Sequence, residues 1–250
     1  MTHTIKNQDN WNAPAADLRL GPDDVHVWRA SLNSSTSCIK GLLEILDTDE
    51  QSRADKYHFK RDRERFIVAR GALRHILSRY LTIAPALIRF NYSPYGKPEL
   101  AGEMNELSFN VSHSNELALY AVALGCDVGL DIEFIREDFA GMEIAERFFS
   151  AQEVAALRAL PSDLQTLAFF NCWTRKEAYI KARGEGFSHP LKQFTVSCAP
   201  GGPAALLSAE NDPHEFSRWR LHELRPGAGY VAALALRGTP GNLSLWQWTK

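Results

Sequence analysis

The most regular hydrophobic pattern in the chain is an alternation between residues 127 and 135. Its apolar positions recur at every second residue: Val128, Leu130, Ile132 and Phe134. A period of two is typical of a strand with one buried face. Asp131 and Glu133 therefore point to the same side, where Gly129 leaves room for a bulky neighbour. Two adjacent carboxylates repel each other, so this face predicts a compensating cation or a shared proton.

A second pattern, with a helical period, covers residues 162–183 and ends at Gly184. We expect a capping box at residues 162–165 to start this helix. Positions four apart lie above one another on a helix, so Trp173, Glu177 and Lys181 share one stripe. One acid and one base of this helix are therefore expected to reach the same point.

Asp131, Glu133 and Glu177 together offer three carboxylates with no Cys or His beside them. Such a ligand set suits a hard cation, Mg²⁺ or alternatively Mn²⁺, which binds oxygen ligands and shares itself with substrate phosphates. The competing interpretation is a surface strand with two solvated acids and a helix with an ordinary Glu-to-Lys pair.

The remaining periodicity repeats one order of elements: a strand, a short helix, a long helix and three strands. In the first round we expect strands near 25–30, 87–92, 107–111 and 117–124, a short helix capped at 48–51, and a long helix over 63–81. In the second round we expect strands near 127–135, 194–198, 218–224 and 230–236 with a last one near 243–248, a short helix from 150, and the long helix of residues 162–183. We therefore predict an α/β fold of the α+β kind, with two similar halves about a pseudo-twofold axis. The predicted division is an N-terminal arm (1–22), a first half (23–125) and a second half (126–250).

Composition narrows the class of protein further. The net charge of −2 over 250 residues gives no general attraction to nucleic acid or to an anionic membrane. The cysteines have neither zinc-site nor disulfide-framework spacing: Cys38, Cys126, Cys172 and Cys198. No apolar run has the length of a signal peptide core or a membrane span. A cytoplasmic protein is expected.

A run of basic residues lies along the first long helix. It contains Lys60, Arg61, Arg63, Arg65, Arg70, Arg74 and Arg79. A basic helix face is often only solvated, but arginine also matches phosphate oxygens in a bidentate way. The run is therefore a candidate wall for phosphates or for an acidic partner protein.

Read in series, several short motifs resemble the Sfp-type 4′-phosphopantetheinyl transferases. The second half carries Val-Gly-Leu-Asp-Ile-Glu (128–133), Phe-Phe-Ser (148–150), Trp-Thr-x-Lys-Glu-Ala-x-x-Lys (173–181), Gly-Glu-Gly (184–186) and Pro-Leu (190–191). The first half carries Gly-Lys-Pro (96–98) and Phe-Asn-Val-Ser-His-Ser (109–114). These motifs stand in the family's order and spacing from about residue 47 to 191, and the resemblance implies the two-half fold of that family.

The resemblance also implies an activity and its residues. The protein would move the phosphopantetheine arm of coenzyme A onto a serine of an apo acyl or peptidyl carrier protein, releasing adenosine 3′,5′-bisphosphate. Mg²⁺ would bind Asp131, Glu133 and Glu177, and Lys181 would stabilise the departing oxygens. The base for the serine is either Glu177 or a water on the metal. The role of Lys176 stays open.

Coenzyme A would be held by residues of the first half. The resemblance implies contacts from Arg70, from Lys97 in a rigid turn, and from Ser112 and His113 in a loop at the 3′-phosphoadenosine end, with Arg53 as a further candidate. Glu50 stands where some relatives place a lysine, so the 3′-phosphate need not be held in the same way throughout the family.

The implied acceptor is a small acidic helical carrier domain of fatty acid, polyketide or nonribosomal peptide synthesis. We expect it to dock near residues 135–149, with Arg136 and Arg147 at the contact, on a monomeric enzyme. Two rival functions use part of the same set of residues. A Mg²⁺-dependent hydrolase of coenzyme A would need the acids without an acceptor, and a binding module would need the basic residues alone.

Overall fold

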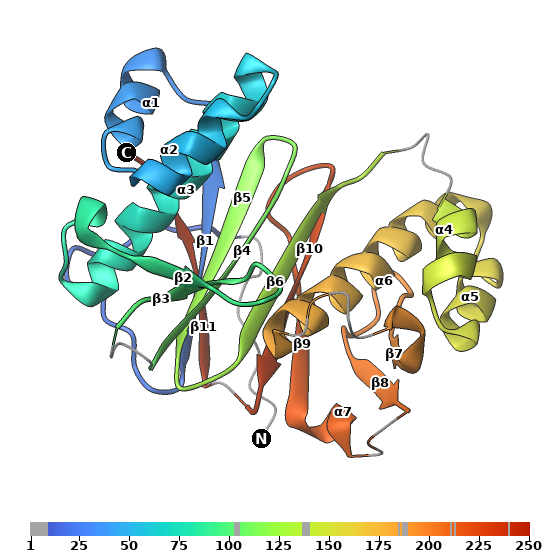
Figure 1. The fold of residues 1–250 in the computed structure, drawn as a ribbon. Helices are drawn as coiled ribbons and strands as arrows, with labels where there is room; N and C mark the ends of the chain where they lie inside the picture. Colours follow the sequence, from blue (N-terminus) through green and yellow to red (C-terminus); the bar gives the residue numbers. More distant parts are fainter. Residues whose placement is uncertain are drawn as a thin grey trace.

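The computed structural model describes residues 10–102, 106–136, 141–184, 186, 190–210, 212, 214–239 and 241–250. Its strands form two main sheets, which lie between two groups of helices (Figure 1). The first sheet has the order β11-β1-β5-β4 and the second has the order β6-β10-β9. Two small sheets, β2-β3 and β7-β8, complete the strand pairing of the described residues.

The first half begins with β1 and three helices, followed by four strands. The elements are β1 (Asp24–Ser31), α1 (Thr36–Leu43), α2 (Thr48–Asp55), α3 (Lys60–Leu81), η1 (Pro85–Leu87), β2 (Phe90–Tyr92), β3 (Pro98–Leu100), β4 (Leu107–Ser114) and β5 (Leu117–Leu124). The apolar stripe of α3, which includes Ile67, Leu73 and Leu77, packs on the first sheet in a core with Trp28 and Tyr120. This burial fixes α3 against the sheet.

The second half repeats that order. Its elements are β6 (Val128–Phe134), α4 (Gly141–Phe148), α5 (Ala151–Arg158), α6 (Ser162–Arg183), η3 (Leu191–Gln193), β7 (Phe194–Val196), β8 (Leu206–Ala209), α7 (Glu215–Arg218), β9 (Trp219–Leu224), β10 (Tyr230–Arg237) and β11 (Asn242–Gln247). The long helices α3 and α6 both have 22 residues and both end at a residue in the left-handed conformation, Thr82 and Gly184. The prediction of a mixed α/β fold in two similar halves is confirmed.

The two halves are joined in two ways. Val27, Ala121, Leu130 and Leu234 belong to one apolar cluster that is shared by both main sheets. The last strand, β11, pairs in parallel with β1, so residues 242–247 extend the sheet of the first half. Asn12 adds an isolated bridge to Trp246, which ties the described part of the N-terminal arm to this edge. The predicted boundary between residues 125 and 126 stays a prediction.

Several local predictions were wrong in detail. The first capping box uses Asp47 and Glu50, one residue earlier than predicted. The Asp47 carboxylate accepts from the Glu50 N–H, and the Glu50 carboxylate accepts from the Asp47 N–H. Helix α6 has no side-chain cap, since Pro161 occupies its N-cap and the Gln165 amide donates to Leu160 O instead. The sequence reading also missed five short helices and strands, α1, α4, α7, β3 and β8. None of the helices within the described residues is both long and apolar enough to cross a membrane.

Candidate functional site

Helix α6 lies directly on the acidic face of β6, and Gly129 makes this approach feasible. A Cβ atom at Gly129 would stand 2.1 Å from Ala178 O and 2.2 Å from Ala182 N. No side chain fits at that distance, so any other residue would push the helix away from the strand. The room predicted beside Gly129 is therefore filled by the backbone of α6. This close contact brings the polar stripe of α6 to the carboxylates of β6.

Asp131 is buried and has an ion pair with a residue of α6. Lys181 Nζ lies 2.6 Å from Asp131 Oδ1. The Ser112 hydroxyl of β4 donates to the same oxygen at 2.8 Å and accepts from Lys181 Nζ at 3.0 Å. The other carboxylate oxygen, Asp131 Oδ2, is buried and has no hydrogen-bond partner within the described residues. One half of the carboxylate is therefore compensated and the other half is not.

Glu133 lies two residues further along the same face. The Ser114 hydroxyl donates to Glu133 Oε2 at 2.9 Å. Burial and the neighbouring Asp131 carboxylate raise the pKa of Glu133. The predicted same-side arrangement of the two acids thus has the expected electrostatic consequence, because like charges close together disfavour ionisation.

Glu177 completes the group of acids from the side of α6. The residue is 8% exposed, and its Oε1 atom is buried without a hydrogen-bond partner in the described part of the chain. Burial, followed by the Asp131 charge, raises the pKa of Glu177 to about 7, against an opposing effect of Lys181. We call Asp131, Glu133 and Glu177 the acidic cluster. As the side chains stand in the described residues, no group of three His, Cys, Asp or Glu side chains already forms a metal site.

A cleft between the two halves opens beside Glu177 and Lys181. It has a volume of about 470 Å³, and its walls come from the β2–β3 turn, β4 and the end of α6. Lys97 lines this cleft, and its Nζ donates to Lys181 O at 2.8 Å, near the C-terminus of α6. Burial lowers the pKa of Lys97. Tyr95 reaches across toward Gly186, where a Cβ atom would lie 3.0 Å from Tyr95 Cβ.

Ser112 and His113 lie within β4, so the loop predicted for these residues is wrong. The strand continues through Ser114 because it pairs with β5 as far as Leu117. Successive residues of a strand point to opposite faces. Ser112 accordingly faces β6, whereas His113 is exposed beside a second hollow of about 240 Å³ that Arg65 also lines. Surrounding protein atoms desolvate the His113 ring, and this effect, followed by the Lys181 charge, lowers the pKa of His113. Part of the side chain nevertheless remains open to solvent.

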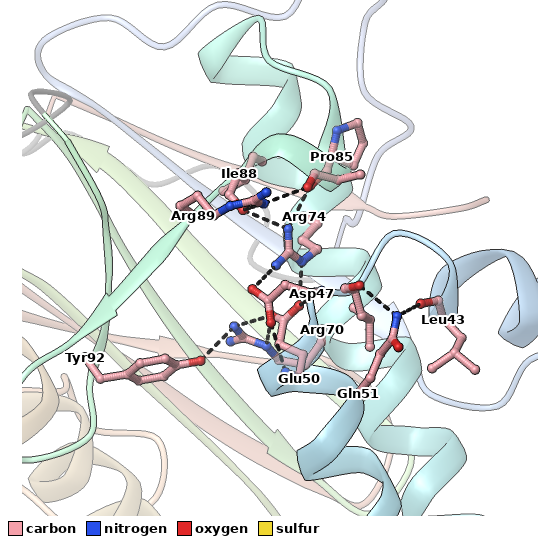
Figure 2. A network of polar contacts seen from close by, with 12 residues as sticks. Leu43, Asp47, Glu50, Gln51, Arg70, Arg74, Pro85, Ile88, Arg89 and Tyr92 are labelled. Atoms are coloured by element: carbon pink, nitrogen blue, oxygen red, sulfur yellow. Dashed lines mark hydrogen bonds and ion pairs between the residues drawn. The ribbon is translucent and has the colours of Figure 1, made fainter.

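Arg70 belongs to α3 and Arg53 to α2. Arg70 Nε donates to Glu50 Oε1 at 2.7 Å, and its guanidinium also donates to the Tyr92 hydroxyl at 3.2 Å (Figure 2). Arg53 is exposed and lies over the Tyr92 ring at 4.5 Å. The predicted coenzyme A contacts of both residues stay predictions.

Arg74 completes a saturated ionic network around Arg70. Its guanidinium is fully buried and donates to Glu50 Oε2 and Asp47 Oδ2 at 2.7 Å each, and to the carbonyl oxygens of Pro85 and Ile88 at 2.9 Å each (Figure 2). We call Asp47, Glu50, Arg70 and Arg74 the arginine cluster. Glu50 holds both arginines and is only 1% exposed.

The role of Lys176, which the sequence left undecided, follows from its contacts in the structure. Its Nζ lies 2.7 Å from Glu153 Oε1 and donates to Phe194 O at 2.7 Å, and both charged side chains are fully buried. Glu153 also forms the capping box of α5 with Ser150. Trp173 packs on Phe169 with ring centroids 6.1 Å apart. Lys176 therefore anchors α6 to α5 and β7, away from the acidic cluster.

The sequence reading missed two residues that the structure places at the site. Asn110 Oδ1 accepts from Leu130 N at 2.9 Å, and Ser114 contacts Glu133 as described above. Both belong to an Asn-x-Ser-x-Ser pattern over residues 110–114. Polar residues at every second position of an otherwise apolar strand were the available signal, since such residues share one face.

Comparison with protein families gives matches to both halves. Residues 28–124 match the family model described as the N-terminal part of 4′-phosphopantetheinyl transferase, and residues 127–235 match that of the 4′-phosphopantetheinyl transferase superfamily. The first range extends from within β1 to the end of β5, and the second extends from β6 into β10. Strand β11 lies outside both ranges.

Individual proteins give the same result. The chain is 37% identical over 243 residues to the 4′-phosphopantetheinyl transferase HetI of Nostoc sp., covering 96% of this chain and 99% of HetI. It is 28% identical over 204 residues to the 4′-phosphopantetheinyl transferase Sfp of Bacillus subtilis, covering 82% of this chain and 88% of Sfp. It is also 26% identical over 217 residues to the human L-aminoadipate-semialdehyde dehydrogenase-phosphopantetheinyl transferase, covering 80% of this chain and 70% of that protein. With both halves matched and nearly all of HetI covered, the chain belongs to the 4′-phosphopantetheinyl transferase superfamily.

Proposed function

We propose that this 4′-phosphopantetheinyl transferase moves the phosphopantetheine arm of coenzyme A to a serine hydroxyl of an apo carrier protein in a Mg²⁺-dependent reaction. The serine oxygen attacks the phosphorus that carries the arm, the bond to the adenosine 3′,5′-bisphosphate breaks, and the serine proton leaves. The observation that carries this proposal is the acidic cluster, of which Glu177 lines the cleft and in which Asp131 Oδ2 and Glu177 Oε1 are buried without partners in the described residues.

The acidic cluster fits a hard divalent cation. Carboxylate oxygens are the ligands that Mg²⁺ and Mn²⁺ prefer, and buried oxygens without a hydrogen bond are costly unless a cation compensates them. The ion would be held by Asp131, Glu133 and Glu177. Without the ion, Lys181 Nζ lies beside the Asp131 carboxylate. When bound, the cation supplies positive charge that offsets the developing charge on the pyrophosphate.

Glu177 and Lys181 have separate proposed roles in the transfer. Glu177 or a water held by the cation accepts the proton of the attacking serine; burial brings the pKa of Glu177 to about 7 in the metal-free chain, and a bound cation would lower it. Lys181 donates hydrogen bonds to the departing phosphate oxygens, for which it must leave Asp131. Positioning and charge stabilisation of this kind carry most of the catalysis in phosphoryl transfer.

Coenzyme A is proposed to enter the cleft between the halves. Lys97 lines the cleft beside the end of α6, where its ammonium can reach a phosphate after release of Lys181 O. His113 is exposed and available to the 3′-phosphoadenosine end. Ser112 and Arg70 are engaged with carboxylates, so their contacts with coenzyme A require a change of partner. Arg53 is exposed and needs no such change.

The carrier protein is proposed to dock beside residues 135–149, of which residues 137–140 lie outside the described structure. Arg147 belongs to the last turn of α4 and lies over the Phe148 ring at 5.2 Å. A basic surface here would complement an acidic carrier. Charge reversal at Arg136 or Arg147 is expected to weaken carrier binding, and unchanged affinity would contradict this docking site. We propose a monomeric, cytoplasmic enzyme.

One experiment tests the function against its rivals. The protein is incubated with coenzyme A, Mg²⁺ and an apo carrier protein, and the carrier is weighed by mass spectrometry with and without a chelator. A gain of one phosphopantetheine arm that requires the metal is the expected result. Free phosphopantetheine would indicate hydrolysis instead, and an unchanged carrier with intact coenzyme A would indicate binding alone.

A further inference from the structure

The junction between the two main sheets is made by side chains. Strands β4 and β6 lie side by side, yet the described residues show no backbone ladder between them (Figure 1). Polar side chains of β4 instead accept from the backbone N–H groups of β6. The three bonds run from Leu130 N to Asn110 Oδ1 at 2.9 Å, from Ile132 N to Ser112 Oγ at 3.4 Å, and from Phe134 N to Ser114 Oγ at 3.0 Å.

These bonds have a clear physical reason. Leu130 and Ile132 are buried, so their N–H groups need partners inside the protein. An ordinary neighbouring strand would provide carbonyl oxygens, whereas β4 presents side-chain oxygens to these N–H groups. The spacing of 20 residues is the same in all three pairs, so the alternating side chains of β4 serve as a substitute for a ladder.

The two serines do more than satisfy the backbone. Ser112 Oγ accepts from Ile132 N and donates its proton to the carboxylate of the residue directly before it, Asp131. Ser114 repeats this arrangement with Phe134 N and Glu133. A hydroxyl has one proton to donate and lone pairs to accept, so each serine couples the position of β6 to the direction of one carboxylate.

Ser114 gives the cleaner case of the two. Ser112 also contacts Lys181, so a substitution there would disturb the ion pair as well. The Ser114 hydroxyl, in contrast, has Glu133 and the Phe134 N–H as its hydrogen-bond partners within the described residues. A change at Ser114 therefore acts on the direction of Glu133 without touching the other members of the acidic cluster.

We propose that Ser114 is a positioning residue that orients the Glu133 carboxylate for the divalent cation. This inference rests on the proposed metal site. Residues that hold a metal ligand by a hydrogen bond commonly contribute about 10- to 100-fold to metal affinity. The hydroxyl keeps Glu133 Oε2 engaged, which leaves the other oxygen of that carboxylate to face the ion together with Asp131 and Glu177.

The test measures binding of Mn²⁺ alone, by electron paramagnetic resonance, to the full-length protein and to Ser114→Ala. The affinity is expected to fall about tenfold or more. The Mn²⁺ concentration for half-maximal transfer should rise in parallel, with a smaller change in kcat at saturating metal. Ser114→Thr keeps the hydroxyl and should restore most of the affinity. Ser108→Ala is the matched control, because Ser108 lies on the same face of β4 without a side-chain hydrogen bond to the described part of β6.

A double-mutant cycle with Glu133→Gln separates orientation from general damage. If Ser114 acts through Glu133, then Ser114→Ala lowers Mn²⁺ affinity much less when Glu133→Gln is already present. An equal loss in both backgrounds, or wild-type affinity in Ser114→Ala, would overturn the positioning role. If Glu133→Gln itself leaves Mn²⁺ affinity unchanged, the proposed metal site fails and not merely its support.

Discussion

The arginine cluster and the acidic cluster are both buried groups of charge, but they differ in compensation. In the arginine cluster, two carboxylates face two guanidinium groups, and the remaining donors of Arg74 reach backbone carbonyl oxygens (Figure 2). In the acidic cluster, Asp131 has an ion pair with Lys181, and the charges of Lys181 and Arg136 oppose the raised pKa of Glu133. Two of its buried oxygens have no partner within the described residues, Asp131 Oδ2 and Glu177 Oε1.

This difference separates a structural network from a site. A saturated network has its charges compensated within the protein, so we infer that it holds α2, α3 and the following turn together. An unsaturated one keeps a cost in free energy that a cation can remove. The raised pKa of Glu177, about 7, is the electrostatic expression of that cost, whereas the arginine cluster balances its charges internally. The presence of many buried charges is therefore less informative than whether each has a partner.

The largest expected effect is on stability, from Arg74→Met. Removal of this fully buried guanidinium leaves Asp47 without its ion-pair partner and Glu50 with Arg70 alone, and breaking a buried ion pair typically costs about 3–5 kcal/mol of unfolding free energy. Denaturant unfolding measures this loss. Arg63→Met on the same helix is the control, since its pair with Asp55 is largely exposed and is worth about 1 kcal/mol at most. Equal losses of unfolding free energy in the two variants would contradict the greater structural importance of the buried ion pairs.

The next effect is on catalysis, from Glu177→Gln. The amide keeps the shape of the side chain but cannot accept the serine proton, so transfer is expected to fall about 100-fold or more. A matched measurement of unfolding should show a stability equal to or above that of the wild type, because an uncompensated buried carboxylate is removed. Glu44→Gln, at the exposed C-cap of α1, is the control for carrier modification rates. Near-normal turnover of Glu177→Gln would refute the assignment.

A smaller effect concerns pH and the metal-free protein. The pKa of Glu177 is about 7 in the folded state and 4.5 is its ordinary value, so between these values the folded chain binds the extra proton. Stability in the presence of a chelator should accordingly fall as pH rises from about 4.5 to 7, by on the order of 2 kcal/mol, and level off above. Unfolding curves of the wild type and Glu177→Gln across this range measure the slope. A slope of the same size in the variant would show that another group causes it.

The smallest effect is on the affinity for the cation, from Lys181→Met. Lys181 is the ammonium that compensates Asp131 in the absence of a metal, so its removal should strengthen Mn²⁺ binding without coenzyme A by about tenfold, or about 1.4 kcal/mol. Transfer should nevertheless fall, since the departing phosphate loses its donor. Titration of Mn²⁺ by electron paramagnetic resonance gives the affinity. Weaker binding in the variant would mean that Lys181 supports the metal and does not compete with it.

Much of the candidate site could be predicted from local patterns. The period of two in β6 placed Asp131 and Glu133 on one face, and the period of 3.6 in α6 aligned Glu177 with Lys181. The order of motifs led to the superfamily that the comparisons confirm. These features depend on residues close together in the chain, where backbone geometry alone decides which side chains share a face.

The sequence alone therefore determined the two elements of the site and the face that each presents. Tertiary structure decided what those faces meet: α6 against Gly129, Ser114 against Glu133, and Lys176 buried on Glu153 away from the acids. It also decided that Arg70 enters a saturated network with Glu50. The reason is that a charged side chain has the same local pattern whether it meets a partner, a ligand or water. Its role is fixed by residues 19 to 50 positions away that only the folded chain brings within hydrogen-bond distance.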